Sequence, residues 1–536
     1  MRGPTERPRR ATEAADGHNG HNGDDEDLVS RGNFESVAER DALRGDGGLR
    51  SDAPAGPGRG GSRTGRVLPV AVPAATALAL GLWGIGRHDS MWRDESVTYQ
   101  VAHRSLGDIW GLLHHIDAVH GLYYLLMHAV FGVWDGGPTA LRLPSVAATV
   151  LAATAVGAIG ARLAGPRTGT LAGLILALLP ITQMYAQEGR SYALVTAGVT
   201  WATYFFVRAT DTPRPRWWTA YALTLGLACW LHEFAALALV AHGLTLWWSK
   251  APRPVWRSWG IAAACVTVGV APLAVVSAGQ AQAQLGWLGR PSLSMWLQFL
   301  AVAVVGALLC RLLVRAGSAG AGAGEAGALT RLALPLLVAP TGLLMLISLV
   351  KPWYVDRYVL YTMAGLALPA GAALSRLITS RRLWAGLSIA AAVAVLLPWS
   401  LLVRSPESRK DDVVAIAHAV QRTAHPGDGV LFMPSRRREW LLSYPRVYDR
   451  LDDLALAESP TASRTLQGTE LPTADIRRHI LAADRVIALL DPQGQPLDPF
   501  PQEEVKRQLL KQHFEECDRI QERGAQIVVY AKPGAC

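Results

Sequence analysis

Residues 67–86 read VLPVAVPAATALALGLWGIG, twenty residues in a row without a charge. A helix needs about 20 apolar residues to cross about 30 Å of hydrocarbon, so this run predicts a transmembrane helix. A cleavable signal peptide would place its apolar stretch much nearer the start of the chain. We therefore expect residues 67–86 to be retained as the first membrane anchor.

Similar apolar runs recur along the 536-residue chain, in which 50% of the residues are hydrophobic. The stretch at 120–134 is about 15 residues long and carries His120 and His128, which suits an interfacial or re-entrant segment better than a crossing. Without it, the sequence predicts eleven spans. They are 67–86, 142–163, 168–185, 191–208, 217–231, 233–249, 259–278, 294–314, 331–350, 358–376 and 383–403.

The residues before the first span differ in composition. Residues 1–66 are rich in Gly, Arg, Asp, Glu and Pro and poor in aromatic and β-branched residues. Such a segment cannot bury enough apolar surface to fold. We expect it to be a disordered cytoplasmic tail, followed by a transmembrane domain over 67–403.

The positions of the basic residues predict the orientation, because Lys and Arg concentrate in short cytoplasmic loops. With the N-terminus inside and 120–134 not crossing, the inside loops take most of the positive charge of the membrane domain. These loops are 162–167, 208–216, 250–257, 311–331 and 376–382. This predicts a multi-pass cell-membrane protein whose C-terminal part is extracytoplasmic. We expect membrane lipids and no nucleic acid as partners, despite the net charge of +9.

From residue 404 onward the pattern is that of a small α/β domain, over 404–536. A helical period begins near Val413, and a second helix is expected around 501–515. Short apolar runs bounded by turn residues predict strands at 430–434, 485–490 and 525–532. The segment has no G-x-G-x-x-G and no P-loop, so it indicates no nucleotide site.

The cysteines and histidines indicate no cofactor. Cys517 and Cys536 could pair if the C-terminal part is extracytoplasmic. HHIDAVH, 114–120, contains residue types that bind metals, but its spacing matches no standard metal site. We therefore assign no metal ligand and no cofactor, while a divalent ion is not excluded.

The predicted outside loops hold the charged and polar residues that do not serve as topology signals. These loops contain RDES (93–96), QEGR (187–190), HEF (232–234), QAQAQ (280–284) and KPWYVDR (351–357). Carboxylates, histidines and cations that converge on one membrane face are what a reaction site needs.

Two of these loops contain adjacent or nearly adjacent acids and bases. Asp94 and Glu95 are either a surface pair at a helix end or a proton acceptor whose pKa is raised by the low dielectric of the interface. Glu188 and Arg190 either pair with each other, or hold a hydroxyl and an anionic group respectively.

The other two loops offer histidine, cations and aromatic rings. His232 either makes a buried hydrogen bond between helices or belongs to the site. Lys351, Arg357 and Tyr358 either anchor the chain at the membrane interface or clamp a phosphate at headgroup depth. A base and a phosphate clamp at one surface suit group transfer from a lipid-linked phosphate to an outside acceptor.

Five motifs in order carry a resemblance to a known family: RDES-x-x-Y, D-x-x-HGLYYLLMHAVFG, LRLPSV, QEGRSYAL and DRYVLY. Over about residues 67–403 the chain resembles bacterial membrane glycosyltransferases of the GT-C fold. The most similar group includes the protein O-mannosyltransferases and the lipid A aminoarabinose transferases, called glycosyltransferase family 39. The C-terminal part resembles the extracytoplasmic domain that many such proteins carry.

The resemblance implies a polyprenyl-phosphate sugar donor, with mannose among the candidate sugars, and inverting transfer to an extracytoplasmic glycan, lipid or protein. It implies that Asp94 is the catalytic base, with Glu95 as its neighbour. Further site residues implied in the same way are Asp117, His120, Tyr123, Glu188, Arg190, Arg357 and Tyr358. The family often has two prolines before its Leu-Tyr-Tyr, where this chain has Gly121 and none.

Two other functions fit the sequence less well. A transporter or flippase of a lipid-linked sugar would place its binding residues near the bilayer midplane, often within repeated halves. Here the charged residues lie at one surface, and the sequence shows no internal repeat. A membrane scaffold that only presents the C-terminal domain would give the acids and arginines of the outer loops no role. The enzyme is therefore the expected function.

Overall fold

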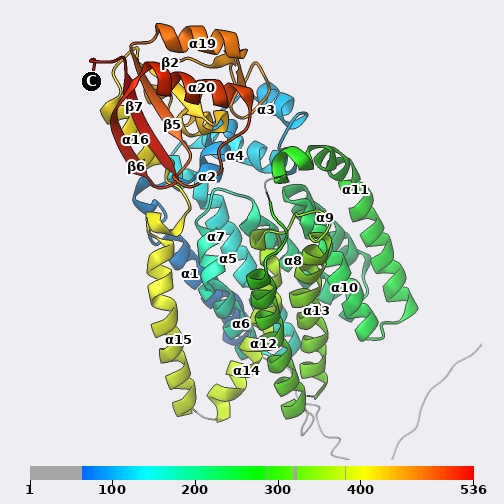
Figure 1. Ribbon diagram of the computed structural model, residues 1–536. Helices are drawn as coiled ribbons and strands as arrows, with labels where there is room; N and C mark the ends of the chain where they lie inside the picture. The colour runs from blue at the N-terminus through cyan, green and yellow to red at the C-terminus, as the bar shows by residue number, and fades with distance from the viewer. Residues whose placement is uncertain (1–62, 287, 318–322, 381) are drawn as a thin grey trace, which may run out of the picture. The chain divides into compact units, whose positions relative to one another are not determined.

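The computed structural model describes residues 63–286, 288–317, 323–380 and 382–536. Residues 1–62 of the predicted tail lie outside this described part. Residues Gly61–Cys536 form one compact unit, in which a bundle of helices carries a smaller α/β region at one end (Figure 1). That end positions the site described below.

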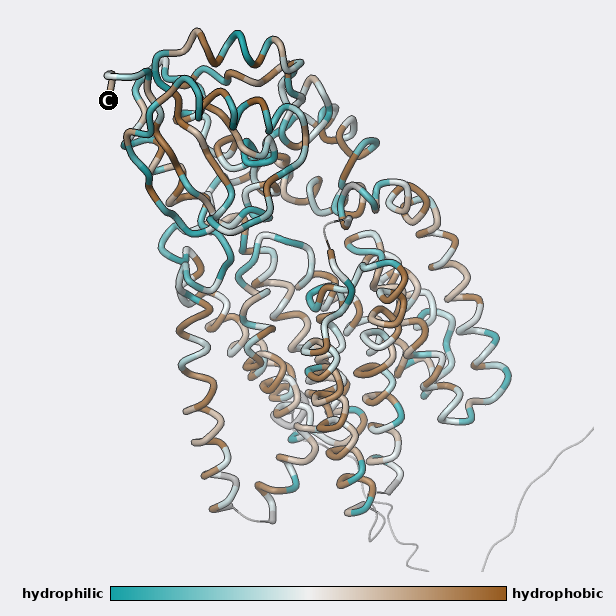
Figure 2. Tube along the Cα trace, in the orientation of Figure 1, coloured by the Kyte–Doolittle hydropathy of each residue, from teal (hydrophilic) through white to brown (hydrophobic). Residues whose placement is uncertain are grey.

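The bundle is built from long apolar helices with short connections. Its members are α1 (Arg63–Leu82), α5 (Gly137–Ala164), α6 (Pro166–Leu178), α7 (Pro180–Ala186), α8 (Tyr192–Asp211), α9 (Pro215–Leu231), α10 (Leu237–Trp248), α11 (Arg253–Leu285), α12 (Leu293–Gly317), α13 (Ala323–Ile347), α14 (Met363–Ser380) and α15 (Arg382–Val403). Apolar residues predominate along these helices, whereas polar residues are frequent in the α/β region (Figure 2).

Within the described ranges, six helices are long and apolar enough to cross a membrane, or seven if α6 and α7, bent by 66°, count as one span. The protein is therefore a multi-pass membrane protein with the predicted helical fold. Four predicted spans fall on α1, α8, α9 and α10, which are shorter or less apolar than those six. The total of eleven and the orientation of the termini remain predictions.

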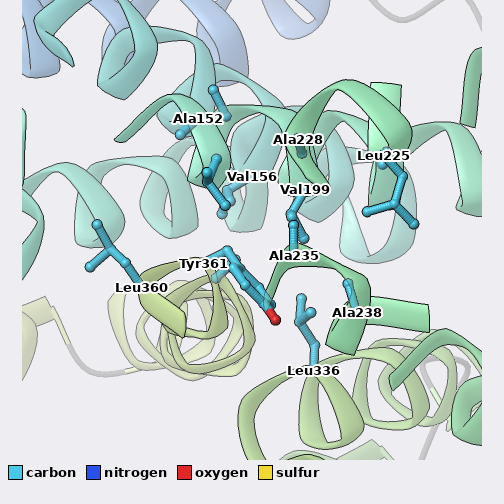
Figure 3. Packing of buried hydrophobic residues seen from close by; sticks show 14 of the residues in the cluster. Ala152, Val156, Val199, Leu225, Ala228, Ala235, Ala238, Leu336, Leu360 and Tyr361 are labelled. Atoms are coloured by element: carbon cyan, nitrogen blue, oxygen red, sulfur yellow. The ribbon is translucent and has the colours of Figure 1, made fainter. Parts of the chain in front are cut away.

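Small residues allow close contact between helices. A Cβ added at Gly157 of α5 would lie 2.0 Å from the carbonyl oxygen of Pro69 in α1. One added at Gly169 of α6 would lie 2.3 Å from the carbonyl oxygen of Gly157. Such backbone contact is typical of helix pairs in membranes. Alanines and small aliphatic residues continue this packing around Tyr361, whose hydroxyl donates to the carbonyl oxygen of Phe234 at 3.0 Å (Figure 3).

The first outer loop folds into short helices over the end of the bundle. They are η1 (Arg87–Asp89), α2 (Arg93–Ala102), α3 (Leu106–Leu113), η2 (Ala118–His120) and α4 (Gly121–Val133). Three of these helices share a buried apolar cluster, formed by Val97, Val101, Ile109, Leu112 and Tyr124. At 13 residues, α4 is shorter than the about 20 that a crossing needs.

The C-terminal region contains a five-stranded sheet of order β2-β1-β5-β7-β6. Strand β1 is parallel to β2 and β5, while β7 is antiparallel to β5 and β6. The strands are β1 (Gly429–Met433), β2 (Asp452–Asp453), β5 (Arg485–Leu490), β6 (Glu515–Glu522) and β7 (Ala525–Ala531). A separate pair is β3 (Leu456–Glu458) with β4 (Thr469–Glu470). The three strands expected from the sequence are confirmed as β1, β5 and β7.

Helices cover both faces of this sheet. They are α16 (Val413–Thr423), α17 (Arg438–Leu442), α18 (Pro445–Tyr448), α19 (Thr473–Ala482) and α20 (Pro501–His513). Val413 and Trp440 belong to the apolar cluster of one face, and Ile476 and Leu509 to that of the other. Cys517 forms a disulfide with Cys536, so the pairing left open by the sequence is present. That residues 404–536 form a separate extracytoplasmic domain remains a prediction.

Candidate active site

A cavity of about 1370 Å³ lies between the α/β region and the end of the bundle that carries it. Each of the five predicted outer loops contributes to its lining, although these loops are far apart in the sequence. The contributing residues include Asp94, Arg190, His232, Gln284 and Arg357. Several of the reactive side chains singled out in these loops therefore come together in this cavity.

Asp94 lies in the first turn of α2 and faces two arginines. Its carboxylate oxygens are 3.9 Å from Arg190 Nη2 and 3.5 Å from Arg357 Nη2. Burial acts to raise the pKa of Asp94, but the positive charges of Arg190 and Arg357 outweigh it and lower that pKa below the ordinary value. The raised pKa that we expected is wrong for this reason. Asp94 is ionised at neutral pH.

Arg357, from η4 (Asp356–Thr362), is held by aromatic residues. Its Nε donates to the hydroxyl of Tyr192 at 3.1 Å. The guanidinium lies 5.8, 5.5 and 5.7 Å from the ring centres of Trp92, Tyr192 and Tyr358. Cation–π contacts of this kind fix a guanidinium without using its hydrogen-bond donors. Arg357 therefore keeps donor capacity toward the cavity.

Arg190 connects Asp94 to a second carboxylate. Its Nη1 donates to the hydroxyl of Tyr124 at 3.2 Å, and that hydroxyl donates to Asp117. Gln284 also donates to Asp117, at 3.3 Å. Burial raises the pKa of Asp117 above its ordinary value. Among the described residues, the buried Nε of Arg190 has no hydrogen-bond partner.

Two histidines lie across from each other on the cavity wall. The rings of His120 and His232 are 5.9 Å apart, and the ring of Tyr358 lies 4.4 Å from that of His232. The Nδ1 atoms of both histidines are buried and lack hydrogen-bond partners within the described ranges. The expected helix–helix hydrogen bond of His232 is therefore not made through this atom. Both residues line the cavity.

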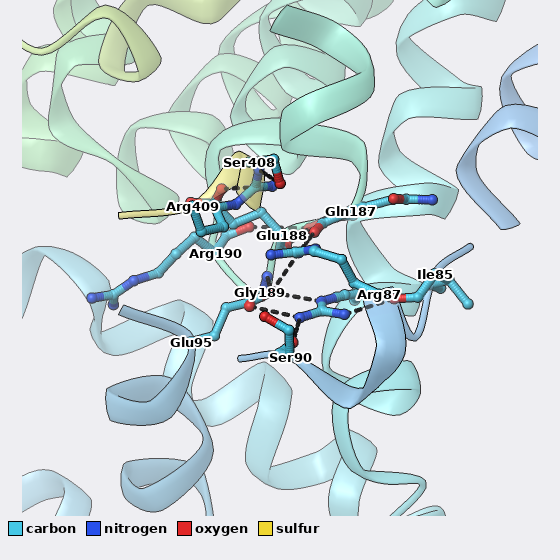
Figure 4. A network of polar contacts seen from close by, with 12 residues as sticks. Ile85, Arg87, Ser90, Glu95, Gln187, Glu188, Gly189, Arg190, Ser408 and Arg409 are labelled. Atoms are coloured by element: carbon cyan, nitrogen blue, oxygen red, sulfur yellow. Dashed lines mark hydrogen bonds and ion pairs between the residues drawn. The ribbon is translucent and has the colours of Figure 1, made fainter. Parts of the chain in front are cut away.

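Glu95, expected as the neighbour of the catalytic base, does not line the cavity. It accepts from Arg142 Nε at 2.7 Å and Nη2 at 2.8 Å, and from the backbone N–H of Gly189 at 3.0 Å (Figure 4). Glu95 and Arg142 are both 0% exposed. Burial acts to raise the pKa of Glu95, but Arg142 and Arg87 outweigh it and lower that pKa to about 2. Glu95 therefore joins α2 to the 187–190 loop.

Glu188 also lies outside the cavity lining. It pairs with Arg409 at 3.5 Å rather than with Arg190. The side chain of Arg190 extends away from Glu188 and Arg409 (Figure 4). Burial raises the pKa of Glu188 to about 7. Neither of its two expected roles, pairing with Arg190 or holding a hydroxyl in the cavity, fits this position.

Tyr123 and Lys351 are the other expected residues absent from the lining. Tyr123 is fully buried in the bundle core. The Lys351 ammonium lies 5.3 Å from the centre of the Trp353 ring. This contact matches the interface-anchoring alternative for Lys351, and of the two cations expected to clamp a phosphate only Arg357 lines the cavity.

Several lining residues were not singled out in the sequence. Trp92, Arg93 and Tyr192 flank predicted residues and could have been found as their neighbours. Asp411 and Glu439 come from the α/β region. They lie more than 300 residues from Asp94 in the chain, and no local pattern connects them to it.

The chain is similar to known proteins in part of its sequence and in its fold. Residues 120–278 match the family model described as dolichyl-phosphate-mannose-protein mannosyltransferase. No curated protein matches the sequence. The structure is similar to that of ArnT from Cupriavidus metallidurans in the apo state, with a TM-score of 0.59 and 14% identity over 86% of this chain and 97% of that one. ArnT from the same organism bound to undecaprenyl phosphate gives 0.58 and 13%, over 87% and 98%.

These likenesses confirm the fold that the five motifs implied. They extend over nearly the whole length of ArnT, so both the helical bundle and the C-terminal region are included. The chain therefore has the GT-C fold, and over residues 120–278 it matches the dolichyl-phosphate-mannose-protein mannosyltransferase family model.

Proposed function

We propose that this protein is a membrane glycosyltransferase that moves a sugar from a polyprenyl-phosphate donor to a hydroxyl of an extracytoplasmic acceptor. The observation that carries the proposal is the placement of one ionised carboxylate, Asp94, between two arginines in a cavity at the end of the bundle. The structural relative bound to undecaprenyl phosphate supports the choice of donor.

Arg190 and Arg357 form the proposed phosphate clamp. Their contacts to Asp94, at 3.9 and 3.5 Å, are longer than the about 2.7–2.9 Å of a charge-assisted hydrogen bond. Neither guanidinium is therefore saturated by Asp94. A phosphate bound between them would satisfy their donors, and it would be neutralised as it leaves the sugar.

Asp94 is the proposed general base. In the reaction, the acceptor hydroxyl oxygen bonds to the anomeric carbon while the bond from that carbon to the phosphate oxygen breaks. The hydroxyl proton passes to Asp94, and the polyprenyl phosphate leaves with the electron pair. Because the pKa of Asp94 is lowered, the group is already ionised and ready to accept a proton at neutral pH.

The cavity offers separate surroundings for the two substrates. Val266, Val270 and Leu285 of α11, with Phe234 and Leu237, form an apolar wall suited to a polyprenyl chain. The α/β region contributes polar residues to the lining, among them Lys410, Asp411 and Glu439. At about 1370 Å³ the cavity exceeds the about 300–1,000 Å³ of a site for one small molecule. The cavity is therefore large enough to hold the sugar end of a donor together with an acceptor.

The direct test is transfer of labelled sugar by the purified protein. Undecaprenyl-phosphate mannose and other polyprenyl-phosphate sugars would be supplied as donors, with a cell-envelope fraction as the source of acceptor. We expect label to move from the donor to envelope material. Movement of intact donor across the bilayer of proteoliposomes, without sugar transfer, would contradict the proposal and favour the transporter.

A further inference from the structure

Helix α2, which carries Asp94, has no N-terminal cap of its own. The residue at the N-cap position, Trp92, makes no side-chain capping hydrogen bond. The first N–H groups of a helix have no partners inside the helix and need an acceptor from elsewhere. Here Asp411 Oδ1 accepts from the backbone N–H of Arg93 at 2.7 Å. The cap of α2 thus comes from a residue 318 positions away.

The contact is reciprocal. The backbone N–H of Val413, the first residue of α16, donates to the carbonyl oxygen of Met91 at 2.7 Å. The starts of α2 and α16 are therefore bound to each other in both directions, where the α/β region meets the first outer loop (Figure 1).

Helix α17 holds the same turn from another side. Arg93 Nε donates to Glu439 Oε2 at 2.8 Å, and Glu439 is 1% exposed. The hydroxyl of Ser443 is 2.6 Å from that of Ser96 and donates to the Ser96 carbonyl oxygen at 3.0 Å. The atoms held belong to residues 91, 93 and 96, on both sides of Asp94.

We propose that Asp411 and Glu439 are positioning residues for Asp94. The inference rests on the proposed function of Asp94 as the base. A base must be held within about 0.5 Å of its productive position, and a shift of about 1 Å can lower the rate about 100-fold. The α/β region, through these two carboxylates, fixes the turn that aims Asp94 between Arg190 and Arg357.

The test compares two adjacent aspartates. Asp412 caps α16 itself, since its side chain accepts from the N–H groups of Val414 and Ala415 at 3.2 and 3.3 Å. Asp411→Ala should lower kcat on the order of 10-fold or more, with KM for undecaprenyl-phosphate mannose within about 2-fold of wild type. Asp411→Asn should restore most of kcat, because Asn caps helices about as well as Asp. Asp412→Ala should lower the Tm and leave kcat near wild type.

A second measurement is independent of activity. Hydrogen exchange of the segment 91–102 in the intact protein, without substrate, reports whether α2 is capped. Asp411→Ala and Glu439→Ala should speed exchange in this segment, whereas Asp412→Ala should not. Unchanged exchange in Asp411→Ala would overturn the positioning role, even if activity falls. If the wild type transfers no sugar but the exchange changes as expected, the proposed function fails and the capping of α2 stands.

Discussion

The fully buried ion pair between Arg142 and Glu95 is expected to contribute strongly to the stability of the protein. Arg142→Ala would leave the Glu95 carboxylate buried without the two Arg142 donors at 2.7 and 2.8 Å. Loss of one partner of a buried pair costs about 3–5 kcal/mol. The pKa of Glu95, lowered to about 2, agrees in direction: Arg142 and Arg87 favour the ionised carboxylate more strongly than burial disfavours it.

Thermal unfolding of the detergent-solubilised protein measures this loss. Arg162 and Asp211 provide the matched control, because they form a pair of the same 2.8 Å length but are 31% and 46% exposed. Arg162→Ala should cost at most about 1 kcal/mol. We expect Arg142→Ala to lower the Tm by several degrees and Arg162→Ala to leave it nearly unchanged. Equal Tm values for the two variants would refute the reasoning.

The pH dependence provides a further check on the same pair. The pKa of Glu95 is depressed in the folded protein, so its stabilising contribution is fully present above about pH 4.5 and is lost as the pH falls toward about 2. Glu95→Gln should lack this acid-dependent loss. A variant whose acid unfolding curve matches that of wild type would show that Glu95 does not titrate as described.

Other predictions concern the clamp, Glu188 and helix packing. Arg357→Gln should weaken undecaprenyl phosphate binding, measured by titration, about 10-fold or more, since a charge-assisted hydrogen bond contributes about 1.5–3 kcal/mol. Lys351→Gln is the control and should bind as the wild type does. An equal loss of affinity in both variants would contradict the clamp. Because the pKa of Glu188 is raised to about 7, wild-type stability should fall as the pH rises from about 4.5 to 7. Glu188→Gln should remove this fall. If the Tm of Glu188→Gln depends on pH as that of the wild type does, the raised pKa of Glu188 is contradicted. Gly365→Ala, whose Cβ would lie 2.6 Å from a backbone oxygen, should cost about 1–3 kcal/mol in unfolding experiments. Gly260→Ala meets no atom within 4 Å and should not; equal effects would refute the close packing.

The convergence of the outer loops could be predicted because it depends only on topology. Arginine-rich loops marked one side, and the remaining loops with RDES, QEGR, HEF and KPWYVDR had to lie on the other. The structure brings Asp94, Arg190, His232 and Arg357 to one cavity. The strands of the C-terminal region were equally accessible, because β1, β5 and β7 are short apolar runs between turns. Strand β6 was missed because its sequence, EECDRIQE, is largely polar.

The division of roles between Asp94 and Glu95 could not be read from the sequence. Adjacent residues of a helix point about 100° apart, so only the rotation of α2 decides which acid enters the cavity. Arg142 fixes that rotation by binding Glu95. In the sequence Arg142 stands at the start of an apolar span, and no pattern there indicates Glu95 as its partner. The lowered pKa of Asp94 could not be predicted either, because it depends on the distances from Asp94 to Arg190 and Arg357.

The most direct test of the central claim is the rate of sugar transfer from undecaprenyl-phosphate mannose by wild type and by Asp94→Asn. A general base contributes about 10²–10⁴-fold to the rate. We predict transfer by the wild type and a fall of at least about 100-fold in Asp94→Asn, with undecaprenyl phosphate still bound. Transfer by Asp94→Asn at the wild-type rate would contradict the assignment of the base.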